Sequence, residues 1–398
     1  MAVIHETADG FILDTLKFYE DCYGELLDVT SRGLRRQAVR PKSCLYNVES
    51  VFKMISEHEA DVRETEMEAV ALERRRKRKR KKERCSQSEP VDSRIELMFN
   101  SIMVSAKAAG LFNHVVSSND NNVVARSLVD SLGCSSLLVE LTGMSCHGAE
   151  RSIGYVQLNT PEDAASCQES FCHNLIESNC VDNISLRLQG RKFLIPTNSS
   201  FLMSDILGLQ EFSQTFDRKF NFLIVDPPWE NKSARRKKVY KRLNNTEFLE
   251  LPIKRMSAEN SLLLLWCTNC KSQREFIEKS LLPHWDFRVV STWYWCKVTK
   301  SGDLIRPFHK GGKKPYETLC IAVRTGQAIP EQLISQKVIV SIPSLIHSAK
   351  PALLELFKKY LPENPKCLEL FARNLLPNFM SWGNEVIHQQ DMDYFDVG

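Results

Sequence analysis

The sequence lacks any apolar run long enough to cross a membrane. A spanning helix needs about 18–20 mainly apolar residues, and every apolar stretch of the chain is shorter. The start of the chain also lacks the cationic and apolar pattern of a secretory signal. We therefore expect a soluble protein with no membrane partner, in a reducing intracellular compartment.

The chain also lacks the cysteine spacing of a disulfide framework and any repeat of fixed period. Its 13 cysteines are scattered. The only close pair of this kind, Cys267 and Cys270, forms a lone C-x-x-C without the second pair that a zinc site needs. We expect free thiols and no bound metal.

Positive charge is concentrated in one place. The net charge is only +4, yet residues Arg74 to Lys82 are nine consecutive Arg or Lys residues. Such a block repels itself and cannot pack into a core. It predicts a nuclear-import signal read by the import machinery, and secondarily an RNA-binding arm. The alternative is a solvated linker with no specific partner. The expected location is the nucleus, with the cytoplasm as a second location.

The 398 residues, 43% of them hydrophobic, suffice for two or three domains. We interpret residues 1–60 as a weakly structured segment, 61–94 as a charged basic linker, 95–200 as a small mixed or helical accessory domain, and 201–398 as the domain that carries the chemistry.

The last 200 residues predict an α/β sheet, because strand-like runs alternate with helical patterns. A capping box at Ser272–Glu275 and a proline at Lys350-Pro351 mark two expected helix starts, the second helix running to Leu361. The expected strands are Phe222–Val225, Ser261–Trp266, Arg288–Lys297, Thr318–Val323, Lys337–Ile342 and Cys367–Phe371.

The most informative motif is Asp226-Pro227-Pro228-Trp229, which follows the apolar run Phe220–Val225. Ligands of open α/β sheets bind at the carboxyl ends of strands. The Asp226 carboxylate and the Pro227 carbonyl can each accept one N–H of an aromatic amine, and Trp229 can stack on the ring. A simple turn after the strand is the alternative reading. The strand before the motif and the indole after it favour an adenine site.

Four further segments accompany this motif. Their acceptors suit ribose hydroxyls and their lysine suits a carboxylate, both of which S-adenosylmethionine carries. Singly, each segment also fits an ordinary surface role. The segments are Ser204-Asp205-Ile206, His347 to Lys350-Pro351, Glu369 to Arg373-Asn374, and Trp382-Gly383-Asn384-Glu385.

Taken together, the ordered motifs from about Phe201 to Val397 resemble the D-P-P-W family of S-adenosylmethionine-dependent adenine-N6 methyltransferases. One branch of that family also shows Asn231-Lys232-Ser233 and the run Lys313 to Glu317. The resemblance implies a permuted Rossmann-like methyltransferase domain, in which the D-P-P-W strand precedes the cofactor-binding strand.

The resemblance also implies roles for single residues. Asp226 and the Pro227 carbonyl would hold the target amine, beside Pro228 and Trp229, and Asp226 would also face the donor's amine. Asp205 and Ile206 would meet the donor's adenine, and Lys350 its carboxylate. The ribose and methionine shell would comprise Glu369, Arg373, Asn374, Asn384 and Glu385. Two departures affect this shell: relatives carry Gln at the position of Glu385, and a His between Arg373 and Asn374.

Basic and polar residues near the motif predict phosphate contacts. Since a base must be unstacked to enter such a pocket, single-stranded or looped RNA is the expected partner. The branch implies small nuclear RNA, with 2′-O-methyladenosine becoming N6,2′-O-dimethyladenosine, and DNA adenine as a second substrate. The nucleic-acid-binding set is Asn231, Lys232, Ser233, Arg235, Arg236, Lys237, Lys313 and Lys314.

Two other functions stay open on the sequence. Some relatives have lost the acidic residue and serve as inactive RNA-binding partner subunits, whereas this chain keeps Asp226. Protein amide-N methyltransferases use Asn-Pro-Pro-Tyr and the opposite motif order. We expect an active monomer, with a partner subunit not ruled out by the sequence.

Overall fold

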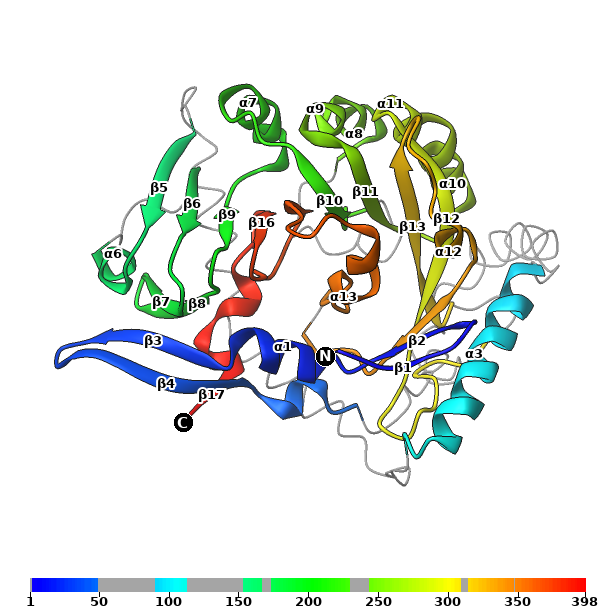
Figure 1. The fold of residues 1–398 in the computed structure, drawn as a ribbon, viewed down its shortest axis with the longest axis horizontal. Helices are drawn as coiled ribbons and strands as arrows, with labels where there is room; N and C mark the ends of the chain where they lie inside the picture. Colours follow the sequence, from blue (N-terminus) through cyan, green and yellow to red (C-terminus); the bar gives the residue numbers. More distant parts are fainter. Residues whose placement is uncertain are drawn as a thin grey trace, which may run out of the picture.

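The computed structural model describes residues 2–48, 90–112, 153–166, 173–229, 243–308, 314–346 and 348–398. The basic tract Arg74–Lys82 lies outside this part of the chain, as do residues 231–237, Lys313 and His347. Across the described ranges, two sheets organise the fold (Figure 1).

The large sheet is mixed, with the strand order β1-β2-β14-β12-β13-β11-β10-β15-β16-β9-β6-β5. Its strands are β1 (Val3–Glu6), β2 (Gly10–Leu13), β5 (Gly154–Leu158), β6 (Asn174–Ser178), β9 (Ser200–Leu202), β10 (Phe220–Val225), β11 (Ser257–Cys267), β12 (Phe287–Lys297), β13 (Tyr316–Arg324), β14 (Val338–Ser341), β15 (Cys367–Leu370) and β16 (Phe379–Trp382).

The smaller sheet has the order β17-β4-β3-β7-β8. Its strands are β3 (Glu25–Thr30), β4 (Gly33–Pro41), β7 (Asn183–Leu188), β8 (Arg191–Ile195) and β17 (Phe395–Val397). In Figure 1 the β3–β4 hairpin, in blue, reaches out to the left below β7 and β8.

Helices, most of them short, pack on the two sheets. They are α1 (Thr15–Tyr23), α3 (Pro90–Ala108), α6 (Pro161–Ser166), α7 (Leu209–Thr215), α8 (Asn245–Glu250), α9 (Ile253–Met256), α10 (Lys271–Phe276), α11 (Leu282–His284), α12 (Glu331–Ile334) and α13 (Leu354–Phe357), with a π-helical segment at Ile277–Leu281 and 3₁₀ turns η1 (Ser43–Tyr46), η4 (Ile206–Gly208), η7 (Lys358–Tyr360), η8 (His388–Gln390) and η9 (Met392–Tyr394).

The central strand β10 is apolar on both sides because both faces of the sheet are covered. Phe222 and Ile224 pack into one core, and Leu223 and Val225 pack into the core on the opposite face. A strand buried on both faces shows a continuous apolar run rather than alternation. All six predicted strands of the last 200 residues are confirmed, with ends that differ by a few residues.

Strands β10 and β15 are parallel neighbours, and the chain connections run in opposite directions along the sheet on their two sides. From β10 the chain continues to β11 on one side, and from β15 to β16 on the other. Ligands bind outside the carboxyl ends of strands at such a switch point. The predicted α/β class is confirmed, and the D-P-P-W motif follows a strand at this point.

The interpretation of residues 1–60 as weakly structured is wrong for residues 2–48. Strand β2 pairs in parallel with β14, and Phe11, Ile12 and Leu13 are buried. A Cβ at Gly10 would lie 1.9 Å from the Val338 carbonyl oxygen, so the close approach of the two strands requires glycine. The sequence missed this because a four-residue strand shows little periodicity and its partner is over 300 residues away.

The predicted accessory domain at 95–200 is also divided differently. Strands β5 and β6 extend the large sheet, whereas β7 and β8 join β3 and β4 in the smaller sheet. Residues 90–94, which we assigned to the linker, form the first turn of α3. The two pairs of strands are stabilised by strands from elsewhere in the chain. The hydrophobic pattern of residues 95–200 therefore does not show which sheet each pair joins.

The first predicted helix start is correct to within two residues although its capping box does not form, and the second predicted start is wrong. Helix α10 begins at Lys271 without a side-chain cap, and the late helix α13 begins only at Leu354, so Lys350 lies before it. A capping box does occur at α8, where Asn244 and Glu247 hydrogen-bond to each other's backbone N–H groups. No helix in the described part of the chain is both long and apolar enough to cross a membrane.

Candidate active site

Five strands bring polar or aromatic side chains to one edge of the large sheet. Asp226 directly follows β10, while Trp266 and Lys297 lie at the ends of β11 and β12. Glu317 lies at the start of β13, which runs antiparallel to its neighbours and therefore begins at the same edge. Glu369 lies within β15, one residue from its end. This is the edge where the sequence predicted the site.

Strand register places several of these side chains on the same face of the sheet. Glu317 pairs with Trp295 across β13 and β12, and Lys297 is two residues beyond Trp295. Residues that pair across neighbouring strands, or that are two apart on one strand, share a face. Trp266 and Trp295 contribute to one core cluster. The aromatic and charged groups thus occupy one continuous strip.

Four of the charged groups form an alternating series that we call the ionic row: Lys297, Glu317, Lys350 and Asp226. The Lys350 Nζ lies 3.0 Å from Asp226 Oδ2 and 3.1 Å from Glu317 Oε2. The other Glu317 oxygen, Oε1, lies 2.5 Å from Lys297 Nζ. The side chains of Lys350 and Asp226 are 16% and 21% exposed, and those of Lys297 and Glu317 are 24% and 37% exposed, so the row is partly removed from water, most of all at Lys350.

The ionic row perturbs the pKa of its members. Burial opposes the ionisation of Glu317, but Lys350 and Lys297 outweigh it and hold the pKa of that carboxyl at about 2. Burial raises the pKa of Asp226 above its usual value, and Lys350 offsets only part of this effect. Burial would lower the pKa of Lys350, yet the two carboxylates raise it. Lys350 is therefore a permanent cation between two acids of unequal strength.

Two tryptophans support the lysines of the row. Lys350 Nζ lies 5.3 Å from the ring centroid of Trp266, and Lys297 Nζ lies 4.2 Å from that of Trp295. Such cation–π contacts stabilise a partly desolvated cation. The indole N–H of Trp266 is buried and has no hydrogen-bond partner among the residues that the structure describes.

Glu369 is the second acid of the site. It pairs with Ile224 on β10 and is only 9% exposed. Burial, together with the nearby charge of Asp226, raises the pKa of Glu369 to about 8, although Lys350 acts in the opposite direction. At neutral pH the side chain is therefore mostly protonated, and it can donate as well as accept a hydrogen bond.

Trp229 is held by its own contacts. Its indole N–H donates to the Trp266 carbonyl at 2.6 Å, and its ring packs on Phe248 with centroids 4.9 Å apart. The Pro227 carbonyl accepts a hydrogen bond from the Trp229 backbone N–H at 2.8 Å. A carbonyl oxygen has two lone pairs, so Pro227 can still accept a second hydrogen bond.

The predicted adenine-binding pair lies after β9. The Asp205 side chain accepts from the backbone N–H of Leu207 and caps the short turn η4, where Ile206 is buried. The Trp382 indole N–H donates to the carbonyl of Ser204 at 3.2 Å and to that of Asp205 at 3.3 Å. The ends of β9 and β16 are thereby connected.

The predicted ribose shell is only partly brought together. Arg373 Nε lies 3.3 Å from Glu385 Oε2, and Glu385 is 2% exposed. Asn384 is half-buried beside it. Asn374 instead donates to the Tyr19 hydroxyl at 3.5 Å. The Arg373–Glu385 ion pair explains how this chain accommodates an acid where relatives carry glutamine.

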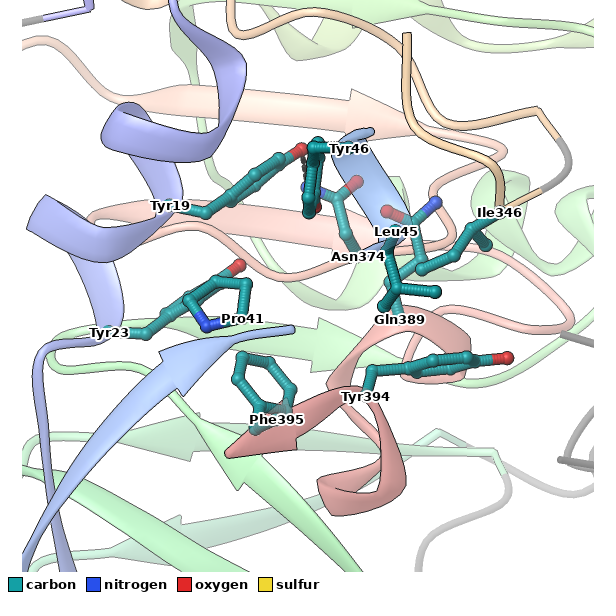
Figure 2. A pocket seen from close by; sticks show the side chains of 10 residues that line it. All are labelled: Tyr19, Tyr23, Pro41, Leu45, Tyr46, Ile346, Asn374, Gln389, Tyr394 and Phe395. Atoms are coloured by element: carbon teal, nitrogen blue, oxygen red, sulfur yellow. Dashed lines mark hydrogen bonds between the residues drawn. The ribbon is translucent and has the colours of Figure 1, made fainter. Parts of the chain in front are cut away.

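Asn374 lines a small cavity between the two ends of the chain, shown in Figure 2. Tyr23 on α1 donates to the Leu375 carbonyl at 2.5 Å, so α1 packs against the segment that follows β15. Burial, and secondarily the nearby Tyr46 and Glu369, raise the pKa of Tyr19 well above its usual value. The remaining lining residues are Pro41, Leu45, Ile346, Gln389, Tyr394 and Phe395.

The structure adds residues that the sequence did not assign to the site, namely Lys297, Glu317 and Trp266. For Lys297 and Trp266 the only signal was a charged or aromatic residue at the end of an apolar strand, whereas Glu317 also belongs to the run Lys313 to Glu317 that the resemblance quoted. Of the predicted nucleic-acid-binding residues, only Lys314 is described, and it forms an ion pair with Asp92 on α3. The others lie outside the described residues, where their roles stay predictions. Within the described residues no group of three or more potential metal ligands occurs.

Comparison with known proteins agrees with this geometry. Residues 220–385 match the MT-A70 family model. The chain is 36% identical over 282 residues to the N(6)-adenine-specific methyltransferase METTL4 of Mus musculus, covering 67% of this chain and 60% of the relative. The branch that the sequence motifs indicate, methyltransferase-like protein four, is the one named by this relative.

Two further relatives are named for different nucleic acids, one for DNA and one for RNA. The chain is 35% identical over 199 residues to the DNA N6-methyl methyltransferase of Caenorhabditis elegans, covering 49% of this chain and 53% of the relative. It is 32% identical over 210 residues to the N6-methyladenosine RNA methyltransferase MTA1 of Pyricularia oryzae, covering 50% of this chain and 56% of the relative. The chain thus spans only about half to three fifths of the length of these relatives.

Proposed function

Because residues 220–385 belong to the MT-A70 family, we propose that this protein transfers a methyl group from S-adenosyl-L-methionine to the exocyclic amine of adenosine in RNA. The observation that carries the proposal is the position of Asp226. Its carboxylate lies at the carboxyl end of the central strand β10, beside the switch point, and Lys350 holds it at 3.0 Å. A positioned acceptor of this kind is what an aromatic amine requires.

The residues present fit the methyl donor. S-adenosylmethionine, the donor used by this family, supplies a methyl group on a sulfonium when bound. Lys350 is a buried cation for its carboxylate, and Glu369 offers hydroxyl-binding oxygen atoms at the end of β15. The unpartnered indole N–H of Trp266 borders the same strip. Asp205 and Ile206 would meet its adenine.

Asp226 would act on the target amine rather than on the methyl group. The amine lone pair of adenine is delocalised into the ring, so the amine is a weak nucleophile. Accepting one N–H at Asp226 and the other at the Pro227 carbonyl fixes the amine and favours a lone pair outside the ring plane. Transfer forms an N–C bond as the S–C bond to the methyl group breaks, with its electron pair kept by the departing thioether sulfur, and leaves one surplus proton on the nitrogen.

The surplus proton would pass to the acceptor already in contact with the amine. Burial raises the pKa of Asp226, which makes this carboxylate a better proton acceptor than an exposed one. Lys350, 3.0 Å from Asp226 Oδ2, favours the ionised carboxylate before transfer. Trp229, held by Trp266 and Phe248, would form a wall of the base pocket.

We place RNA first as the substrate, with small nuclear RNA and 2′-O-methyladenosine as the finer assignment and DNA adenine as the alternative. A permuted Rossmann-like domain is supported by the order of the strands, since the D-P-P-W strand β10 precedes its neighbour β15 in the chain. Nuclear location through residues Arg74–Lys82, and action as a monomer, belong to the same proposal.

The decisive experiment treats matched RNA and DNA oligonucleotides with purified protein and isotope-labelled S-adenosylmethionine, followed by mass spectrometry of the nucleosides. We expect label in N6-methylated adenosine from RNA, with more from a 2′-O-methylated target. Donor binding measured by calorimetry without any label transfer would instead indicate that the substrate is wrong. Neither donor binding nor transfer would overturn the proposal and favour an RNA-binding subunit.

A further inference from the structure

The smaller sheet carries a second concentration of charge, on strands β3, β4, β7 and β8. Asp28 on β3 pairs in register with Arg35 on β4. Asp28 also accepts hydrogen bonds from Ser185 on β7 and from Lys192 on β8, the latter at 2.5 Å. Since cross-strand partners share a face, these four strands present one common face.

Two further arginines belong to this face or its border. Arg187 pairs in register with Lys192, and Arg32 lies in the turn that joins β3 to β4. The turn is defined by hydrogen bonds, because the Thr30 hydroxyl accepts from the Arg32 backbone N–H at 3.2 Å and donates to the Gly33 carbonyl at 2.8 Å. We call Arg32, Arg35 and Arg187 the arginine face.

The charges of the arginine face are not balanced locally. The acid on this face, Asp28, is 5% exposed and is already paired with Lys192. Arg32, Arg35 and Arg187 are exposed. In the described ranges, none of their guanidinium groups takes part in an ion pair or hydrogen bond with another side chain. Three permanent positive charges therefore face solvent together.

The opposite face of the same strands is closed. Ile184, Leu186 and Ile195 are fully buried in a hydrophobic cluster with Ala164 of α6. On β7 and β8 a partner can therefore reach Arg187 but not the opposite face, whereas both faces of β4 carry exposed side chains. From β4 to β7 the backbones are about 10 Å apart, two strand spacings, so Arg35 and Arg187 can reach different groups of an extended partner.

We propose that the arginine face binds the phosphate backbone of the substrate RNA strand. Guanidinium groups match phosphate oxygens with paired hydrogen bonds, and backbone contacts position a strand without reading its sequence. The inference rests on the proposed function, which makes RNA the substrate. It assigns RNA binding to residues that belong to neither the D-P-P-W motif nor its basic neighbours.

The test uses two full-length triple variants that lose the same number of charges. The first is Arg32→Gln, Arg35→Gln and Arg187→Gln. The matched control is Arg40→Gln, Lys279→Gln and Lys366→Gln, three exposed cations elsewhere; Arg40 lies on the other face of β4, opposite Asp396. Circular dichroism and donor calorimetry check that both variants fold and bind S-adenosylmethionine.

RNA affinity is then measured against salt concentration with a single-stranded oligonucleotide and its DNA counterpart. For the first variant we expect affinity for RNA to fall about tenfold to hundredfold near 0.1 M salt, and the salt slope to fall by about 2, since each lost contact removes about 0.7. An affinity and slope equal to those of the control would overturn the inference, as would a loss confined to DNA.

The two proposals can fail separately. If the enzyme function is wrong, wild-type protein transfers no methyl group to RNA, while the first variant can still lose RNA affinity. If only the arginine face is wrong, wild-type protein methylates RNA and both triple variants bind RNA alike.

Discussion

The ionic row and the arginine face use charge in opposite ways. In the ionic row, two lysines and two acids alternate at 2.5–3.1 Å and are partly shielded from water. On the arginine face, three guanidinium groups are exposed and unbalanced. Short contacts in a low-dielectric site fix geometry, whereas exposed charges act over about a Debye length.

Under the proposed function, the difference separates two tasks of one enzyme. Holding an amine and a donor requires side chains whose positions do not change, which the ionic row provides through mutual contacts. Capturing a long polyanion requires attraction before contact, which the arginine face provides. The variants below either break the ionic row or show that it behaves differently from the arginine face.

The largest effect is expected from Asp226→Ala. Loss of one positioned polar group at a reacting centre commonly costs about 100-fold to 1,000-fold in rate, and we expect single-turnover methyl transfer to fall by that amount. Asp217→Ala, at a side chain 86% exposed, is the matched control. Near-normal turnover by the Asp226 variant would show that this carboxylate does not hold the amine.

Lys350→Ala should raise the dissociation constant for S-adenosylmethionine about tenfold to hundredfold, the value of a charge-assisted contact of roughly 1.5–3 kcal/mol. Asp226 and Glu317 both lose their shared cation, so the melting temperature should also fall.

Calorimetry well below that temperature separates donor affinity from stability. Lys350→Arg keeps the positive charge and should recover most of the stability. It should not recover all of the donor affinity, because a planar guanidinium group differs in shape from an ammonium group. Donor affinity unchanged in the alanine variant would mean that Lys350 serves only the ionic row.

Glu369→Gln should change how stability depends on pH. The unfolded carboxyl titrates near its ordinary value of 4.5, whereas the folded one titrates at about 8. Between these values the folded state binds more protons, so the free energy of unfolding falls as pH rises across this window. The glutamine variant should lose this decline and melt a few degrees higher than wild type at pH 8. Melting curves that stay parallel from pH 5 to pH 8 would contradict the assignment.

The smallest effect is expected from salt on donor binding. Raising salt from about 50 to 200 mM should weaken RNA binding by tenfold or more, yet change donor affinity by less than about twofold, since buried pairs are weakly screened. Titrations of donor and RNA on the same preparation provide the comparison. A donor affinity as salt-sensitive as RNA affinity would place Lys350 in contact with solvent.

Some features of this protein follow from the sequence alone because they are local. The run Phe220–Val225 is rich in residues that favour a buried strand, and Asp226 directly follows it. The stiff proline pair then points the motif out of the sheet. The ordered motifs were enough to predict the family, the α/β class and the donor.

Only the tertiary structure decided which distant residues share a site. Lys297, Glu317 and Lys350 are far apart in the chain and meet because antiparallel β13 begins at the edge where β12 ends. The helix that was expected to start at Lys350 starts later, and the Lys350 side chain lies in the ionic row instead. Likewise, the four-residue strand β2 has only β1 as a local partner and joins the rest of the large sheet through the remote strand β14. Short elements of this kind are determined by packing against remote partners, which local patterns do not record.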